Sequence, residues 1–185
     1  MTVLLVAGHD TTAYTVAWTL KELAKNPKEQ KKLRDCLISM EESDWCKSNT
    51  LSNVVKEGMR LHPVAAGASI RTVGRDLITK SYFLPKGTIA FIPLILLHRN
   101  SDVFENADRF DPSRWDQPTP AMTKAFIPFS AGKQGCLGRS LANAEINTII
   151  SQICGKFELE LIDEGKTEFC LFLKPVKTMV MAKKI

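Results

Sequence analysis

Residues 129–138 read Phe-Ser-Ala-Gly-Lys-Gln-Gly-Cys-Leu-Gly, and this stretch decides how the chain is interpreted. Its cysteine, Cys136, comes just before a predicted helix that begins near Arg139. The free N–H groups and the dipole of a helix N-terminus favour a thiolate over a thiol. The three glycines carry no side chain, so the backbone can approach a flat group closely. An axial thiolate ligand of a heme iron needs both of these features, an anionic sulfur and a backbone that comes close to a flat macrocycle.

The same stretch has a simpler interpretation, namely a buried free cysteine in a glycine-rich turn. Buried free cysteines are common, and for Cys136 taken alone this interpretation would be favoured. The glycine spacing and the helix that follows shift the balance towards a ligand. Backbone N–H groups that point at the sulfur would then tune how strongly it donates electrons.

A second motif, Ala-Gly-His-Asp-Thr-Thr at residues 7–12, lies inside the first predicted helix. Gly8 costs about 1 kcal/mol relative to alanine in a helix interior. Thr11 can turn its hydroxyl back to a main-chain carbonyl and bend the helix, which would admit a small molecule and a water. Asp10 or Thr11 could instead cap a helix N-terminus. The apolar residues 3–6 continue the helical pattern upstream, which favours a position in mid-helix.

Glu57 and Arg60 lie three residues apart on a predicted helix, so both side chains fall on one face. Such a pair is usually a surface salt bridge worth about 0–1 kcal/mol. Arg114 follows later, in the sequence Pro-Ser-Arg-Trp. Taken alone, the Glu57–Arg60 spacing is therefore a very weak signal.

The cysteine stretch resembles the heme-binding signature of the cytochrome P450 family, Phe-x-x-Gly-x-Arg-x-Cys-x-Gly. Phe129, Gly132, Cys136 and Gly138 are in register with it. One position departs, because Gln134 stands where the family has a basic residue that contacts a heme propionate. Glutamine still donates a hydrogen bond but carries no charge. The departure therefore concerns the propionate contact and not the thiolate.

The Ala-Gly-His-Asp-Thr-Thr motif is similar at every position to the family's oxygen-activating sequence, Ala/Gly-Gly-x-Asp/Glu-Thr-Thr/Ser. This resemblance implies that Asp10 relays protons and that Thr11 hydrogen-bonds the bound oxygen. Glu57 and Arg60 resemble the family's Glu-x-x-Arg pair, and Arg114 the arginine that joins it. The resemblance implies a structural role for this triad. If the three groups are buried together they must satisfy one another, because an unpaired buried charge is costly. We expect them to pin the long irregular segment that precedes the cysteine.

Two further positions resemble the family more loosely. Arg71 lies at about the distance of a family arginine that binds a heme propionate, although a solvent-facing arginine on a strand is an equally good interpretation. The dipeptide His98-Arg99 resembles a recurring pair in the family, and we assign it no chemistry at this point.

The resemblance covers essentially the whole chain and implies a fold class that is mainly α with small β-sheets (α+β), the C-terminal part of the cytochrome P450 fold. Residues 1–185 would form a single partial domain, because the family's domain is much longer and its region before the helix that carries the motif at residues 7–12 is missing here. The implied cofactor is heme b (iron protoporphyrin IX), with Cys136 as the protein ligand to the metal. The implied function is a monooxygenase that inserts one atom of O2 into an organic substrate.

The resemblance also implies partners. Electrons would come from an NADPH-dependent reductase that meets a basic surface including Lys133 and Arg139, and the substrate would be small and lipophilic. Two alternatives stay open: a non-catalytic heme-binding remnant, and an enzyme that rearranges peroxides without external electrons. The intact Asp10-Thr11 pair argues against the second. We expect the chain alone to bind heme weakly and to turn over little.

Composition narrows the other possibilities. The chain has 185 residues and a formal net charge of +5, without an aromatic-interleaved basic stripe, so nucleic acid is not an expected partner. Its five cysteines form no CxxC pair, which disfavours a disulfide framework. No stretch is long and apolar enough to span a bilayer. Full-length eukaryotic relatives would be anchored in the endoplasmic reticulum membrane, on its cytoplasmic face.

Hydrophobic periodicity and proline positions predict the secondary structure. We expect helices over 2–24, 27–40, 51–61 and 139–155, with a polar linker over 41–50. Short strands are expected over 68–72, 77–83 and 88–93 and again within 157–183. Residues 99–128 show weak periodicity, and an irregular segment of this length usually has a function.

Overall fold

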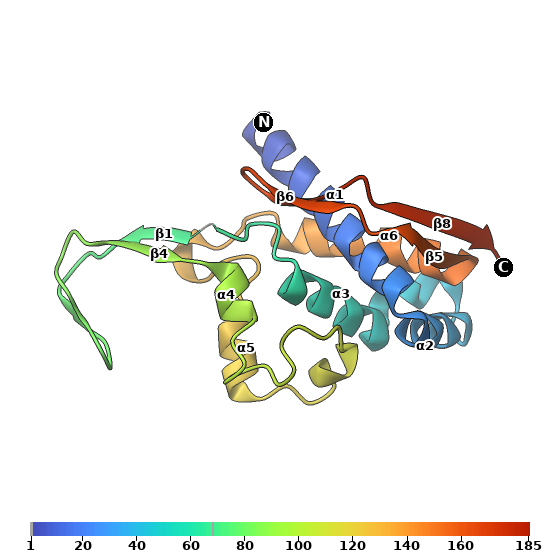
Figure 1. Ribbon diagram of the computed structural model, residues 1–185, viewed down its shortest axis with the longest axis horizontal. Coiled ribbons are helices and arrows are strands. Elements are labelled where there is room, and N and C mark those ends of the chain that lie inside the picture. Colours follow the sequence, from blue (N-terminus) through green and yellow to red (C-terminus); the bar gives the residue numbers. More distant parts are fainter. Residues whose placement is uncertain (1, 68) are drawn as a thin grey trace.

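The computed structural model describes residues 2–67 and 69–185, and four long helices form its centre (Figure 1). They are α1 (Thr2–Lys25), α2 (Pro27–Ile38), α3 (Asn49–Leu61) and α6 (Arg139–Lys156). Each expected helix is confirmed with ends shifted by at most two residues. The expected linker over 41–50 is wrong in part, because Glu42–Lys47 form the 3-10 helix η1. The fold class is confirmed as mainly helical with small antiparallel sheets.

Local signals explain where these helices begin and end. Pro27 occupies the first turn of α2, where its missing N–H costs nothing. The Ser48 hydroxyl caps α3 by accepting from the Leu51 N–H. Pro63 follows shortly after the end of α3, because the position before a proline disfavours helical backbone. The inward faces of the four helices share one buried cluster, whose members include Leu23, Leu33, Leu37, Leu51, Val54, Ile146 and Ile150.

The strands form four separate antiparallel pairs. β1 (Ser69–Thr72) pairs with β4 (Ile89–Ile92), and β2 (Leu77–Ile78) pairs with β3 (Phe83–Leu84). β5 (Phe157–Asp163) pairs with β8 (Met179–Lys184), and β6 (Lys166–Phe169) pairs with β7 (Leu173–Val176). β1 and β4 form an arm that projects from one side of the helices (Figure 1).

The expectation of one strand over 77–83 is wrong, because the chain reverses in the middle of that stretch. The Thr79 hydroxyl oxygen accepts hydrogen bonds from the N–H groups of Ser81 and Tyr82, at 3.3 and 2.9 Å. This closes a tight turn between β2 and β3. The first residue of the strand expected over 68–72 lies outside the described residues.

The irregular segment 99–128 is confirmed as mostly without regular structure, but it contains two short helices. These are η2 (Pro112–Trp115) and α5 (Pro120–Ala125), and α4 (Leu94–His98) comes just before the segment. Helices of four to six residues give too few repeats for a periodic signal. The segment has its own buried cluster around Phe104 and Trp115.

Helices α1 and α3 approach each other closely at Gly58. A Cβ on Gly58 would meet the side chain of Thr19, whose hydroxyl donates to the Thr15 carbonyl at 2.8 Å. Gly8, on the same helix as Thr19, has nothing within 4 Å of the position of a Cβ. Gly58 therefore allows the two helices to come close together, next to Glu57, the first residue of the charged pair on α3.

Replacing Gly58 with alanine should lower the free energy of unfolding by about 1–3 kcal/mol, because the added methyl overpacks the α1–α3 contact. The matched control is Gly8→Ala, which adds the same methyl to an uncrowded helix position and should raise the free energy of unfolding by about 1 kcal/mol. Urea denaturation of both variants measures the difference. Equal effects of the two substitutions would contradict the close approach at Gly58.

Candidate functional site

The loop before α6 is closed by its own backbone. The Cys136 N–H donates to the Phe129 carbonyl at 2.9 Å, and the Gly135 N–H donates to the Gly132 carbonyl at 3.0 Å. Gly132 has φ +71°, a conformation that glycine adopts without strain. No atom lies within 4 Å of the position of a Cβ on Gly132, so this side of the loop is open. The loop therefore has a closed backbone and an open face at Gly132.

Cys136 is exposed and lies two residues before α6, whose N-cap residue Gly138 provides no side-chain cap. The sulfur therefore lies near a helix N-terminus whose backbone N–H groups have no side-chain acceptor from the N-cap residue. Cys154 differs, because burial raises the pKa of its thiol to about 12 and keeps it protonated. Cys170 is exposed in the turn between β6 and β7. An exposed thiol beside a helix N-terminus and an open glycine face fits the thiolate side of a heme.

Two arginines contact the cysteine loop. Arg71, on β1, donates from Nη2 to the Ser130 hydroxyl at 3.0 Å. Arg71 is therefore not simply a solvent-facing arginine, because its guanidinium contacts the cysteine loop. The guanidinium of Arg139 lies 5.8 Å from the centroid of the Phe129 ring, over its face. Gln134 is exposed on the loop. Positive charge is therefore held at the loop by Arg71 and Arg139, while residue 134 adds none.

The motif at residues 7–12 lies well inside α1, so the helix-capping interpretation of Asp10 and Thr11 is wrong. The Thr11 hydroxyl donates to the Ala7 carbonyl at 2.8 Å, as expected from the sequence. Thr15 repeats this contact with the Thr11 carbonyl at 2.8 Å. Asp10 Oδ1 lies 2.9 Å from His9 Nδ1, with the His9 side chain exposed and that of Asp10 partly exposed.

Glu57, Arg60 and Arg114 lie together in the interior. The Glu57 and Arg60 side chains are fully buried, and that of Arg114 is 8% exposed. Arg60 donates to both Glu57 oxygens, with Nη2–Oε1 2.8 Å and Nε–Oε2 2.9 Å. Arg114 Nε donates to Oε1 at 2.9 Å. Buried ion pairs of this geometry satisfy the charges that burial would otherwise leave uncompensated.

Sequence reasoning missed two further donors to the same carboxylate. The Trp115 indole N–H donates to Glu57 Oε2, and the Asp111 backbone N–H donates to Oε1, both at 2.9 Å. Arg60 also donates to the main-chain carbonyls of His98, Ala107 and Arg109, at 2.9, 2.6 and 3.1 Å. The Glu57 cluster, meaning Glu57, Arg60, Arg114 and Trp115, therefore fixes the backbone of the irregular segment at several points.

His98 is buried next to this cluster. Burial, followed by the nearby Arg60 guanidinium, lowers the pKa of His98 from 6.5 to about 4. The imidazole is therefore neutral near pH 7. Its Nε2 accepts a hydrogen bond from the Ile127 N–H at 3.1 Å.

The free energy of unfolding should fall as the pH drops from about 6.5 to about 4, because the unfolded chain then protonates His98 and the folded chain does not. The gap between the two pKa values corresponds to about 3 kcal/mol, fully present above pH ~6.5. Urea midpoints across this range, compared with those of His98→Gln, measure the contribution. An identical pH dependence in the two proteins would contradict a neutral buried His98.

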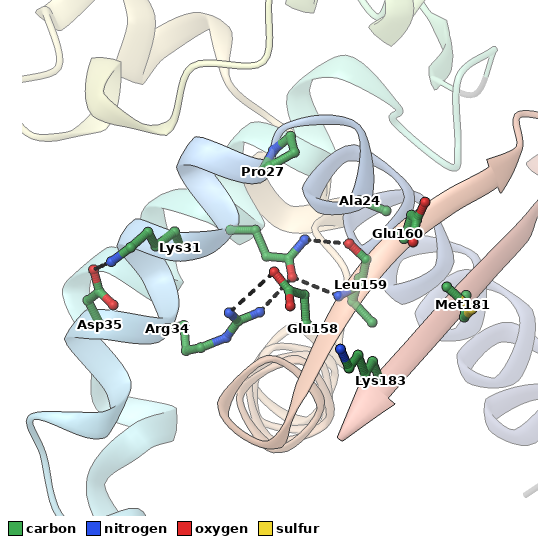
Figure 2. Close-up of a pocket in the computed structure, with 11 residues that line it drawn as sticks. Ala24, Pro27, Lys31, Arg34, Asp35, Glu158, Leu159, Glu160, Met181 and Lys183 are labelled. Carbon is green, nitrogen blue, oxygen red and sulfur yellow. Dashed lines mark hydrogen bonds and ion pairs between the residues drawn. The ribbon is translucent and has the colours of Figure 1, made fainter. Parts of the chain in front are cut away.

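A separate cleft of about 610 Å³ opens between α2 and the strands β5 and β8 (Figure 2). Lys31 and Arg34 line it from α2, and Glu158 and Lys183 line it from the strands. Arg34 Nη1 lies 3.9 Å from Glu158 Oε1, and Arg34 Nη2 donates to the Phe157 carbonyl at 3.3 Å. The residues predicted as site residues are not among those that line this cleft, which we leave without a function.

The mainly helical fold, the open cysteine loop and the buried carboxylate–arginine cluster define a class of heme-thiolate proteins. A sequence model of the family described as "Cytochrome P450" matches residues 1–184. The chain belongs to the cytochrome P450 family. Members of this family are heme-thiolate monooxygenases, and heme is their cofactor.

Individual relatives agree with this assignment. The chain is 32% identical to "Cytochrome P450 11B, mitochondrial" of Aquarana catesbeiana, over 96% of the chain and 36% of the relative. It is 31% identical to "Cholesterol side-chain cleavage enzyme, mitochondrial" of Rattus norvegicus, over 96% of the chain and 35% of the relative. A crystal structure of a cytochrome P450 (CYP102L1) superposes with a TM-score of 0.86 at 26% identity, covering 98% of the chain and 44% of the solved chain.

The chain spans about a third of the length of the curated relatives it matches. Both of these relatives are mitochondrial by name, so the endoplasmic reticulum expected for eukaryotic relatives is not the only compartment in the family. Among residues 2–67 and 69–185, no helix has the length and apolar character needed to cross a bilayer.

Proposed function

We propose that this chain supplies the thiolate side of a heme b site in a monooxygenase, with Cys136 as the protein ligand to the iron. The observation that carries the proposal is the exposed Cys136 sulfur beside the N-terminus of α6, on a loop whose backbone is already closed. Glycine at 132 leaves the loop face open to a planar group. When bound, heme supplies the activation of O2, and the protein positions and tunes it.

The residues around the cysteine have distinct proposed roles. The Phe129 carbonyl accepts from the Cys136 N–H, and the Phe129 ring lies beneath the Arg139 guanidinium, so Phe129 holds the loop. Arg71 contacts the loop at the Ser130 hydroxyl, which supports a role for it in binding a heme propionate, with Gln134 as an uncharged second donor. Gly138 sits at the N-cap of α6, with the position of a Cβ 3.9 Å from the Cys136 sulfur.

The residues of α1 have a proposed role in proton delivery. The Thr11 hydroxyl donates to Ala7 and keeps its lone pairs free to accept from a group bound beside the helix. Asp10 is partly exposed and contacts His9, which gives it access to solvent protons. The Glu57 cluster, far along the sequence from both, holds the segment that leads into the cysteine loop.

The proposed reaction inserts one oxygen atom into a small, lipophilic organic substrate, with electrons from an NADPH-dependent reductase. The relative named for cholesterol side-chain cleavage supports a lipophilic substrate. A basic surface that includes Lys133 and Arg139 supports docking of an acidic electron donor near the cysteine. Both residues are exposed.

Thiol modification in the presence of hemin tests the ligand assignment. Hemin should protect Cys136 from iodoacetamide and leave Cys170 reactive, because both thiols are exposed but only Cys136 lies at the open loop. Peptide mass spectrometry after a short pulse reports each cysteine separately. Unchanged labelling of Cys136 at saturating hemin, or equal protection of Cys170, would refute the assignment.

A further inference from the structure

His98 connects the Glu57 cluster to the segment that enters the cysteine loop. It is the last residue of α4 and is fully buried. Its carbonyl oxygen accepts from Arg60 Nη1 at 2.9 Å, and its Nε2 accepts from the Ile127 backbone N–H at 3.1 Å. A ring nitrogen that accepts carries no proton, so the proton of the neutral ring is on Nδ1.

Two more backbone contacts continue from Ile127 to the cysteine. The Ile127 carbonyl accepts from the Ser130 N–H at 2.9 Å. The Phe129 carbonyl, between these two residues, accepts from the Cys136 N–H at 2.9 Å. A shift of Ile127 would therefore move the Phe129 carbonyl, to which the Cys136 N–H is hydrogen-bonded.

Packing alone does not account for a histidine at this position. The His98 ring does pack against Phe126, with ring centroids 5.4 Å apart, and an apolar ring would do this equally well. Within the described part of the chain, the buried His98 Nδ1 has no partner with good hydrogen-bond geometry, although the Met59 backbone is near enough to raise the pKa of the ring. What the imidazole adds over an apolar ring is the acceptor at Nε2, which satisfies the Ile127 N–H.

We propose that His98 is a positioning residue for the heme-thiolate loop, which holds Ile127 through a neutral acceptor at Nε2 and thereby fixes the backbone that carries Cys136. The inference rests on the proposed function for its consequence at the heme. The hydrogen-bonded path from Arg60 to Cys136 is a property of the chain itself. His98 does not touch the reacting groups and acts only through the loop.

A pair of amide substitutions separates the acceptor from the rest of the side chain. The oxygen of His98→Gln can reach the position of Nε2, whereas that of His98→Asn can reach only the position of Nδ1. Hydrogen exchange of the Ile127 and Cys136 amides, measured by NMR without heme, should be about tenfold faster in His98→Asn and nearly unchanged in His98→Gln. With heme, the thiolate-type absorption of the reduced carbon monoxide complex should weaken only in His98→Asn.

His62→Asn is the matched control, because His62 is another largely buried histidine and is hydrogen-bonded to Glu22 at 2.8 Å, away from the loop. Faster exchange at Cys136 in this control, to the extent seen in His98→Asn, would mean general destabilisation and would overturn the inference. Equal behaviour of the two His98 variants would overturn it too. If His98→Asn does not fold, the hydrogen bond itself can be tested in the unsubstituted chain, by the 15N–15N coupling between the Ile127 amide and His98 Nε2. Absence of this coupling would also overturn the inference.

Failure of the proposed function gives a different pattern. The unsubstituted chain would then form no thiolate-type complex with heme, while amide exchange would still separate His98→Asn from His98→Gln. That result would support the role of His98 in positioning the loop and would remove only the consequence of that role for heme binding.

Discussion

Glu57→Gln should lower the free energy of unfolding by about 3–5 kcal/mol, the largest effect we expect from any change in this chain. The substitution keeps the volume of the side chain, so no cavity explains the loss. It removes the charge that two buried guanidiniums share, those of Arg60 and Arg114. Because small domains are stable by only about 5–15 kcal/mol, much of the folded population should be lost. Urea denaturation followed by circular dichroism measures it.

The same chemical change at Glu42 provides the control. Glu42 Oε1 lies 2.7 Å from Lys156 Nζ and joins η1 to α6, but both side chains are exposed. Exposed ion pairs add little to stability, so Glu42→Gln should leave the urea midpoint nearly unchanged. Equal midpoints for the two variants would show that the Glu57 cluster does not hold the irregular segment.

Cys136→Ala should abolish the thiolate-type absorption of the reduced carbon monoxide complex formed with heme. No other described cysteine combines exposure, a helix N-terminus and an open glycine face. Without the sulfur, any heme that still binds would be held by other side chains or by nonspecific apolar contact, with the spectrum of a nitrogen or oxygen ligand. Absorption spectra at equal heme loading compare the variants.

Two controls bracket this prediction. Cys170→Ala removes an exposed thiol, and Cys154→Ala removes a fully buried one whose pKa burial raises to about 12. Both should keep the thiolate spectrum, although Cys154→Ala leaves a small gap in the core and should lower stability. A loss of the spectrum in either control as large as in Cys136→Ala would show that the ligand is misassigned.

The parts of the fold that follow from the sequence are those with local causes. Pro27 and Pro63 mark helix ends through the geometry of their own residues, so α2 and α3 were predictable within two residues. The turn at Thr79 was missed because its hydroxyl closes a reversal within a stretch of apolar residues. The helix η1 and the short helices α4 and α5 have too few residues to show periodicity.

The residues of the candidate site likewise divide into those that could be predicted from the sequence and those that could not. Glu57, Arg60 and Arg114 could be predicted because they resemble a family motif, whereas a Glu-x-x-Arg pair alone usually indicates only a surface salt bridge. Trp115 was quoted in the motif but received no role, because its contact with Glu57 depends on how an irregular segment folds. His98 was noted only as part of a recurring dipeptide and received no role, since its partner is a backbone N–H, which every residue but proline has.

X-ray absorption at the iron edge of the heme complex of the unsubstituted chain tests the central claim most directly. The account predicts one sulfur atom in the first coordination shell of the iron, and its loss in Cys136→Ala. A first shell of nitrogen and oxygen alone in the unsubstituted chain would contradict it.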